Sequence, residues 1–270
     1  MKQGGIRIGR VFGIDIHVNW SWLIILALVT WNLTDVFSRS RPDWSPVFTW
    51  GLSLAAALLF FGAVLIHELA HSLVAKGRGI PVEEITLFIF GGVSNIEEQP
   101  DSAAGEFLMA ILGPVTSLVV GAILMALAGV AGDPGTVIGD PEGMLSQLTP
   151  LTTLLLWLGA VNIILGVFNL IPGFPLDGGR VLRSILWALT DSLERATRWA
   201  SLVGVVIAGA MIVTGGLMAF GAEVPFFGSG WLNGIWLALI GWFLLSASRR
   251  HLRQGPRPRS GRSGMGEASP

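Results

Sequence analysis

The stretch FTWGLSLAAALLFFGAVLIHELAHSLV, residues 48–74, decides the fold, because this long apolar run carries His67-Glu68-Leu69-Ala70-His71 near its end. About 20 mostly apolar residues are enough to cross a bilayer as a helix. Two histidines and a glutamate within such a run are expensive to insert into lipid, so they indicate a functional site.

The spacing of the two histidines predicts a metal site. Residues four apart lie on one face of a helix, so both imidazoles can reach one Zn²⁺. Glu68 is turned by about 100° from His67, so it can face water at the metal without being a ligand. This is the H-E-x-x-H arrangement of zinc hydrolases, in which the glutamate is the general base. The alternative is that the histidines only hydrogen-bond a neighbouring helix.

Composition places the chain in a membrane. It has 270 residues, of which 52% are hydrophobic and 13% are charged, whereas soluble domains carry about 25% charged residues. Apolar runs predict six membrane segments. Their approximate bounds are 18–33, 48–75, 103–130, 151–171, 196–220 and 231–248. The chain has no cysteine, so a metal must be held by His, Asp, Glu or Asn.

The distribution of basic residues predicts the orientation. Fifteen of the 17 Lys and Arg residues fall on the side that holds both ends of the chain, and the 131–150 connection has none. The positive-inside rule therefore puts both termini in the cytoplasm. Met1 is not followed by a signal-peptide pattern. The histidine motif then lies inside the bilayer, nearer its cytoplasmic face.

A catalytic zinc takes three protein ligands and keeps one position open for water. The fourth segment ends in VFNLIPGFPLDGGR, residues 167–180, where two prolines and a glycine break the helix. Non-helical backbone near the membrane is tolerated where protein or a watery cavity surrounds it. Asp177, in this broken region, is the candidate third ligand. The alternative role for Asp177 is an N-cap of the helix that begins near Gly178.

Two asparagines of the fourth segment share one helix face, Asn162 and Asn169. An amide at Asn169 can donate to the oxyanion of a tetrahedral intermediate or bind the substrate backbone. The alternative for both residues is hydrogen bonding between helices. We favour a catalytic role for Asn169 and the structural role for Asn162.

The chain resembles the site-2 protease family of intramembrane zinc metalloproteases. The matching residues are the motif at 67–71 and the N-x-x-P-x-x-P-L-D-G-G-R string at 169–180, with Phe90-Gly91-Gly92 and Gly113-Pro114 as supporting matches. The resemblance covers about residues 9–250. It implies that His67, His71 and Asp177 bind one Zn²⁺ per chain, that Glu68 is the catalytic base, and that Asn169 holds the substrate or its oxyanion.

The resemblance also gives meaning to two segments rich in strand-forming residues. Residues 80–97 contain strand formers followed by Gly91-Gly92 as a turn or bulge. In the family, such a segment dips into the membrane, and its edge can pair with an extended substrate. Residues 6–17 alternate as well and can pair beside it. A cytoplasmic amphipathic hairpin is the alternative for 80–97.

These observations predict an all-α membrane protein with six transmembrane helices and a short membrane-associated β segment near the active site. Residues 1–17 form an N-terminal cytoplasmic strand segment, 18–248 the membrane metalloprotease core, and 249–270 a disordered basic tail. Many family members carry PDZ or CBS domains, and nothing here resembles either.

The expected function is zinc-dependent endopeptidase activity within the membrane. The expected partners are the lipid bilayer and a transmembrane protein substrate, which we expect to be single-span, and no nucleic acid. We expect the chain in the cell membrane of a prokaryote. The alternative is a metal transporter that uses the same His and Asp residues as a transit site. Transport would be retained without Glu68, whereas proteolysis would be lost.

Overall fold

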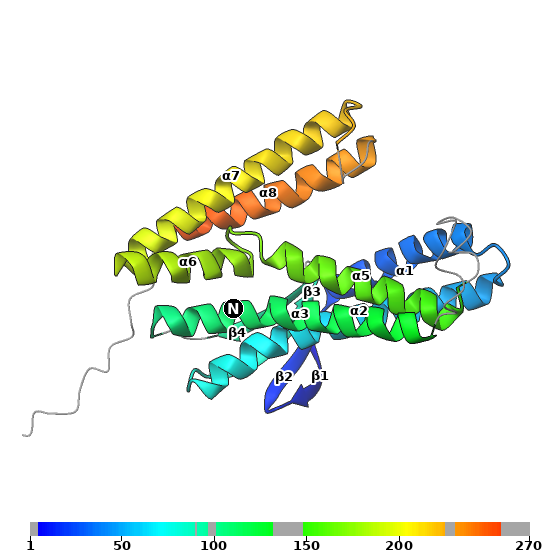
Figure 1. Ribbon diagram of the computed structural model, residues 1–270, viewed down its shortest axis with the longest axis horizontal. Coiled ribbons are helices and arrows are strands. Elements are labelled where there is room, and N and C mark those ends of the chain that lie inside the picture. The colour runs from blue at the N-terminus through cyan, green and yellow to red at the C-terminus, as the bar shows by residue number, and fades with distance from the viewer. Residues whose placement is uncertain (1–4, 90, 97–100, 132–147, 225–229, 255–270) are drawn as a thin grey trace, which may run out of the picture.

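The computed structural model describes residues 5–89, 91–96, 101–131, 148–224 and 230–254. The helices are α1 (Trp20–Ser40), α2 (Pro46–Gly77), α3 (Ala103–Ala131), α5 (Pro150–Asn169), α6 (Asp177–Thr190), α7 (Leu193–Ala219) and α8 (Trp231–Gln254) (Figure 1). The strands are β1 (Gly5–Val11), β2 (Ile14–Asn19), β3 (Val82–Phe88) and β4 (Gly91–Ile96). Six of these helices, all except α6, are long and apolar enough to cross a membrane. The predicted fold class, a helical six-span membrane protein with a small β segment, is confirmed.

Local sequence signals set where two of the spanning helices begin. The Ser45 side chain accepts a hydrogen bond from the backbone N–H of Phe48, and Pro46 follows at the start of α2. Thr149 and Pro150 repeat this arrangement at α5. The cap satisfies a backbone donor that the helix leaves free, and proline gives up no hydrogen bond at that position.

Two helix ends differ from the sequence prediction. Helix α1 reaches Ser40 instead of residue 33, and its polar last turns are held by an i,i+4 ion pair between Arg39 and Asp35 at 2.7 Å. Helix α8 continues to Gln254, so residues 249–254, which the sequence assigned to a disordered tail, are helical. Residues 255–270 lie outside the described part of the chain, and their disorder stays a prediction.

The four strands form one sheet in the order β1-β2-β3-β4. The N-terminal segment was predicted as one alternating strand, but it is a hairpin, because Phe12 and Gly13 turn the chain with φ values of 52° and 77°. Strand β2 then pairs in parallel with β3, as the sequence suggested for the two segments. Strands β3 and β4 are antiparallel, and Phe90 between them lies outside the described residues. Strand β4 has β3 as its one strand neighbour in the described sheet.

The helices are arranged in two groups. Helices α1, α2, α3 and α5 lie together, while α7 and α8 form a pair that diverges from them in Figure 1. The short helix α6 connects the groups, because it packs on both α3 and α7. The irregular segment 170–176 leads from α5 into α6, so the break predicted at the prolines is present.

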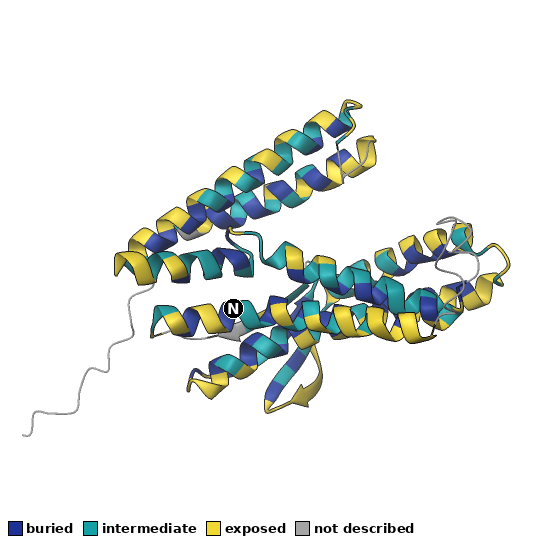
Figure 2. Ribbon diagram, viewed as in Figure 1, coloured by how far each residue is buried: buried dark blue, intermediate teal, exposed yellow. Residues whose placement is uncertain are grey.

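The surface of the long helices is suited to lipid. Figure 2 shows exposed positions along all of them, and many of these are large apolar side chains, such as Trp20, Val206 and Trp231, which are 64%, 70% and 67% exposed. Soluble monomers seldom expose such extended apolar surfaces to water. The distribution therefore agrees with a multi-pass membrane protein.

Two polar contacts join segments that the charge pattern assigned to one side of the membrane. The Lys76 ammonium at the end of α2 donates to the carbonyl of Phe12 at 2.7 Å, which ties α2 to the N-terminal hairpin. Arg183 of α6 is paired with Glu106 in the first turn of α3. That these segments face the cytoplasm stays a prediction.

Candidate metal centre

Helix α2 presents the two histidines of the motif on its buried side. His67 and His71 are each 4% exposed, and their Nε2 atoms are 3.2 Å apart. The helix continues without a break through both residues, so the i,i+4 spacing alone brings the two imidazoles together. The close approach predicted from the sequence is therefore present.

Helix α3 orients both imidazole rings. The Nδ1 of His71 is 2.6 Å from the carbonyl oxygen of Met109, and the Nδ1 of His67 is 2.9 Å from Ser117 Oγ. Because a carbonyl can only accept, the His71 Nδ1 carries the hydrogen and its Nε2 keeps a free lone pair. Such contacts to the distal nitrogen are typical of histidines that ligate a metal.

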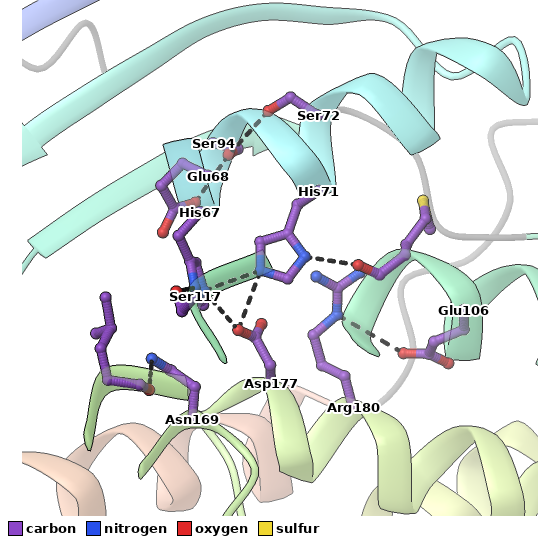
Figure 3. Close-up of polar contacts among 12 residues, drawn as sticks. His67, Glu68, His71, Ser72, Ser94, Glu106, Ser117, Asn169, Asp177 and Arg180 are labelled. Atoms are coloured by element: carbon purple, nitrogen blue, oxygen red, sulfur yellow. Dashed lines mark hydrogen bonds and ion pairs between the residues drawn. The ribbon is translucent and has the colours of Figure 1, made fainter. Parts of the chain in front are cut away.

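Asp177 completes the cluster from the first position of α6. Its Oδ2 is 3.1 Å from His67 Nε2 and 3.0 Å from His71 Nε2 (Figure 3). Burial disfavours the charged carboxylate, but the two imidazoles beside it outweigh burial and hold the pKa of Asp177 well below its usual range. The N-cap position of α6 belongs to Leu176, and no side chain in the described part of the chain caps that helix. The alternative role of Asp177 as an N-cap is therefore not observed.

The three side chains fit a zinc ion. One ligand atom from each of His67, His71 and Asp177 lies within 4.8 Å of the other two, and two imidazole nitrogens with one carboxylate oxygen are a usual donor set for catalytic zinc. Gly113 of α3 borders the cluster. A Cβ there would lie 2.8 Å from His67 Nε2 and closer still to His71 Nε2. The absence of a side chain at Gly113 therefore lets α3 approach the two imidazoles closely.

Glu68 lies beside this cluster and is not part of it. Its Oε2 accepts a hydrogen bond of 3.0 Å from Ser94 Oγ, and Ser94 Oγ is in turn 3.1 Å from Ser72 Oγ. Glu68 is turned toward β4 while the histidines face α3 and α6, as the helical rotation predicted.

Asn169 and Asn162 bond within their own helix. The Asn169 amide donates to the carbonyl of Leu165 at 3.0 Å, and the Asn162 amide donates to the carbonyl of Leu158 at 2.7 Å. Among the described residues, neither amide nitrogen makes the bond between helices that was the alternative for both residues. Asn162 is 1% exposed, whereas Asn169 borders the same cavity as the metal cluster.

A cavity of about 540 Å³ opens onto the cluster. Its polar lining residues include His67, Glu68, His71, Ser94, Asn169, Asp177 and Arg180. Aromatic side chains from α2, β3 and α8 also line it, among them Phe60, Phe61, Phe88 and Phe243. The cavity therefore has the candidate metal ligands in its lining and apolar walls that can hold an apolar peptide segment.

The sequence does not predict several residues that support the site. Ser94, Ser117 and the carbonyl of Met109 orient the site, but nothing in their local sequence marks them. The buried pair of Glu106 and Arg183 had a signal, because a carboxylate in an apolar segment implies a partner.

The chain is similar to known metalloproteases over most of its length. Peptidase family M50 matches residues 55–211. The protein named "Putative zinc metalloprotease Rip3" from Mycobacterium tuberculosis strain H37Rv is 37% identical over 251 residues, which cover 92% of this chain and 58% of that protein. The protein named "Putative zinc metalloprotease sll0528" from Synechocystis is 40% identical over 243 residues, covering 90% and 58%. This chain therefore spans little more than half the length of these relatives.

A solved structure has the same fold. The "Site-2 Protease from Methanocaldococcus jannaschii" matches with a TM-score of 0.58 and 28% sequence identity, over 93% of this chain and 96% of that one. The region matched by the family, residues 55–211, includes both halves of the metal cluster. Together with the family match and the identities to the metalloproteases, this similarity shows that the chain belongs to peptidase family M50, the site-2 protease family.

Proposed function

We propose that this chain is a zinc-dependent endopeptidase that hydrolyses peptide bonds in or near transmembrane segments of membrane proteins. One observation carries the proposal. The cluster of His67, His71 and Asp177 lies at a helix long enough to cross a membrane, beside Glu68 and an apolar-walled cavity. A protease for soluble peptides has no need of a site within such a helix.

One Zn²⁺ per chain, held by His67, His71 and Asp177, would polarise a peptide carbonyl and acidify water. Glu68 is the general base of the proposal, because its carboxylate borders the cavity next to the histidines. It takes a proton from the attacking water and passes that proton to the leaving amine. The names of the relatives, which describe zinc metalloproteases, support the choice of metal.

Asn169 has a supporting role in the proposal. Its amide nitrogen bonds to the carbonyl of Leu165 in the resting structure, and it lines the cavity with Glu68 and Asp177. An amide hydrogen aimed into the cavity can donate to the substrate carbonyl oxygen as negative charge develops there. Catalytic hydrogen bonds often tighten only when substrate is bound.

The cavity and the sheet edge support the substrate class of the proposal. A transmembrane helix hides its peptide bonds, so it must unwind before a carbonyl can reach the site. Strand β4 borders the cavity at Gly91, Gly92, Val93 and Ser94, and an edge strand can hold an extended peptide by backbone hydrogen bonds. We therefore propose a membrane-embedded, single-span protein as the substrate.

We also propose a location and an orientation for the protein. Both termini lie in the cytoplasm of a prokaryotic cell, in its cell membrane, and water reaches the site from that side. The charge pattern of the sequence and the prokaryotic relatives support this placement.

The test is cleavage of a panel of single-span membrane substrates in liposomes by wild type and by Glu68→Gln, at matched bound zinc. Wild type should cleave, and Glu68→Gln should be slower by about 100-fold or more, because it cannot act as a base. Glu223→Gln is the matched control, since Glu223 is exposed beyond α7 and should leave the rate unchanged. Full activity of Glu68→Gln would refute the assigned mechanism.

The same liposomes test the alternative function, metal transport. If neither wild type nor Glu68→Gln cleaves but both carry zinc across the bilayer at equal rates, the cluster is a transit site. Zinc that stays bound without flux argues against a transporter.

A further inference from the structure

Ser94 connects the proposed base to the strand at the cavity edge. Its Oγ is 3.0 Å from Glu68 Oε2 and 3.1 Å from Ser72 Oγ, and Figure 3 shows it between these two side chains. A carboxylate can only accept, so Ser94 gives its single hydroxyl hydrogen to Glu68 and accepts from Ser72. The three side chains form an ordered chain of hydrogen bonds with a defined direction.

Helix α2 and strand β4 are in register for this contact. Glu68 and Ser72 are four apart, so they form a stripe on α2 beside the stripe of the two histidines. On β4, Gly92 and Ser94 are two apart and point to the same face. A Cβ at Gly92 would lie 2.5 Å from Glu68 Cγ, so the strand passes directly against the glutamate. The absence of a side chain at Gly92 allows Ser94 to reach the carboxylate.

This contact leaves the two oxygens of Glu68 with different surroundings. Within the described part of the chain, Ser94 is the one side-chain hydrogen-bond partner of Glu68, and it holds Oε2. A free glutamate side chain samples several rotamers, so one fixed oxygen orients the carboxylate and leaves Oε1 for the proton transfer.

We propose that Ser94 is a positioning residue that orients the Glu68 carboxylate and makes this orientation depend on strand β4. The inference rests on the proposed function, in which Glu68 is the base and an extended substrate lies along β4. A substrate that pairs with β4 then aligns the strand and the base together. A segment that fails to pair leaves the base less ordered and is cut more slowly.

The test compares wild type, Ser94→Ala and Ser94→Thr in liposomes with a cleavable single-span substrate. Ser94→Ala should lower kcat about tenfold, since a misplaced catalytic group loses rate steeply with distance. KM should stay within about twofold, and bound zinc should not change. Ser94→Thr keeps a hydroxyl and should recover most of kcat. The matched control is Ser53→Ala, because Ser53 is buried in the same helix as Glu68 and its hydroxyl has no partner among the described residues.

Three results would overturn the inference. The first is an unchanged kcat in Ser94→Ala. The second is a kcat in Ser94→Thr that is as low as in Ser94→Ala. The third is a Ser94→Ala variant in which only KM or the bound zinc changes. Wild-type cleavage reports separately on the proposed function, because that function fails if wild type cleaves nothing while Ser94 is intact.

A measurement without substrate tests the contact between Ser94 and Glu68 directly. Ser94→Ala should lower the melting temperature in the wild-type background by more than in a Glu68→Ala background, where only its contact with Ser72 remains to be lost. Equal shifts in the two backgrounds would show that the two side chains do not interact and would overturn the inference.

Discussion

The two halves of the candidate metal centre are built in different ways. In α2, helix geometry alone places His67 and His71 on one face. Asp177 comes from a position 106 residues beyond His71, after an irregular segment with no repeating geometry. The first half is specified by local sequence, and the second half by packing between distant elements.

The packing around the second half is dense and polar. Gly178 lies against the carbonyl oxygens of Leu170 and Ile171, where a Cβ would overlap them. Ser248 of α8 donates to the carbonyl of Phe174 at 2.5 Å. The Asp177 carboxylate therefore depends on contacts from several helices, whereas one helix brings the histidine pair together and α3 only orients the rings. A substitution that disturbs the packing should therefore weaken metal binding by displacing Asp177 before it displaces the histidines.

Among substitutions in this packing, Glu106→Gln is expected to lower the free energy of unfolding the most. The Glu106 side chain is fully buried and pairs with Arg183 on α6, which begins with Asp177. Removing one partner of a buried ion pair leaves an uncompensated charge and costs about 3–5 kcal/mol. The free energy of unfolding in detergent should fall by that amount, and zinc affinity should fall with it.

The control for Glu106→Gln is a pair on the surface. Asp35 and Arg39 form an exposed i,i+4 ion pair in α1, so Asp35→Asn should change the free energy of unfolding by less than about 0.5 kcal/mol. If Glu106→Gln is as mild as this control, α6 is not held by the buried pair.

A smaller effect is expected from Gly178→Ala. The added methyl group would meet backbone carbonyls that cannot turn away, and such overpacking costs about 1–3 kcal/mol. Gly209→Ala in α7 is the control, because none of the described residues comes within 4 Å of a Cβ there, and alanine should stabilise that helix by up to about 1 kcal/mol. Equal unfolding free energies for the two variants would contradict the account of segment 170–176.

The smallest effect on stability is expected in the histidine half, from Ser117→Ala. It removes the hydroxyl that holds His67 Nδ1 but leaves the helix intact. Loss of such an orienting partner weakens metal binding by about tenfold. Competition with a zinc chelator measures this change, and Ser201→Ala, at a buried serine of α7 without a hydroxyl partner among the described residues, should show none. A large loss of stability in Ser117→Ala would mean that the histidine half also depends on packing.

The same difference explains what the sequence could predict. The six spans and the paired histidines follow from hydropathy and helical periodicity, which act within one segment. Asp177 was an open choice on local grounds, because a carboxylate at a helix start also suits an N-cap, and the family resemblance decided for the ligand. Ser94, Ser117 and the Met109 carbonyl could not be found, since their roles arise only when β4 and α3 pack against α2. The N-terminal hairpin was missed because its turn at Phe12-Gly13 interrupts an alternating pattern without a strong turn signal.

The most direct test of the central claim is the zinc content of purified wild type, His71→Ala and Asp177→Ala, with zinc-edge X-ray absorption on the wild type. The account predicts about one zinc per chain in wild type, bound by nitrogen and oxygen without sulfur. It predicts loss of that zinc from both variants, although their ligands come from differently built halves. Retention of one tightly bound zinc in either variant would contradict the assignment of the centre to His67, His71 and Asp177.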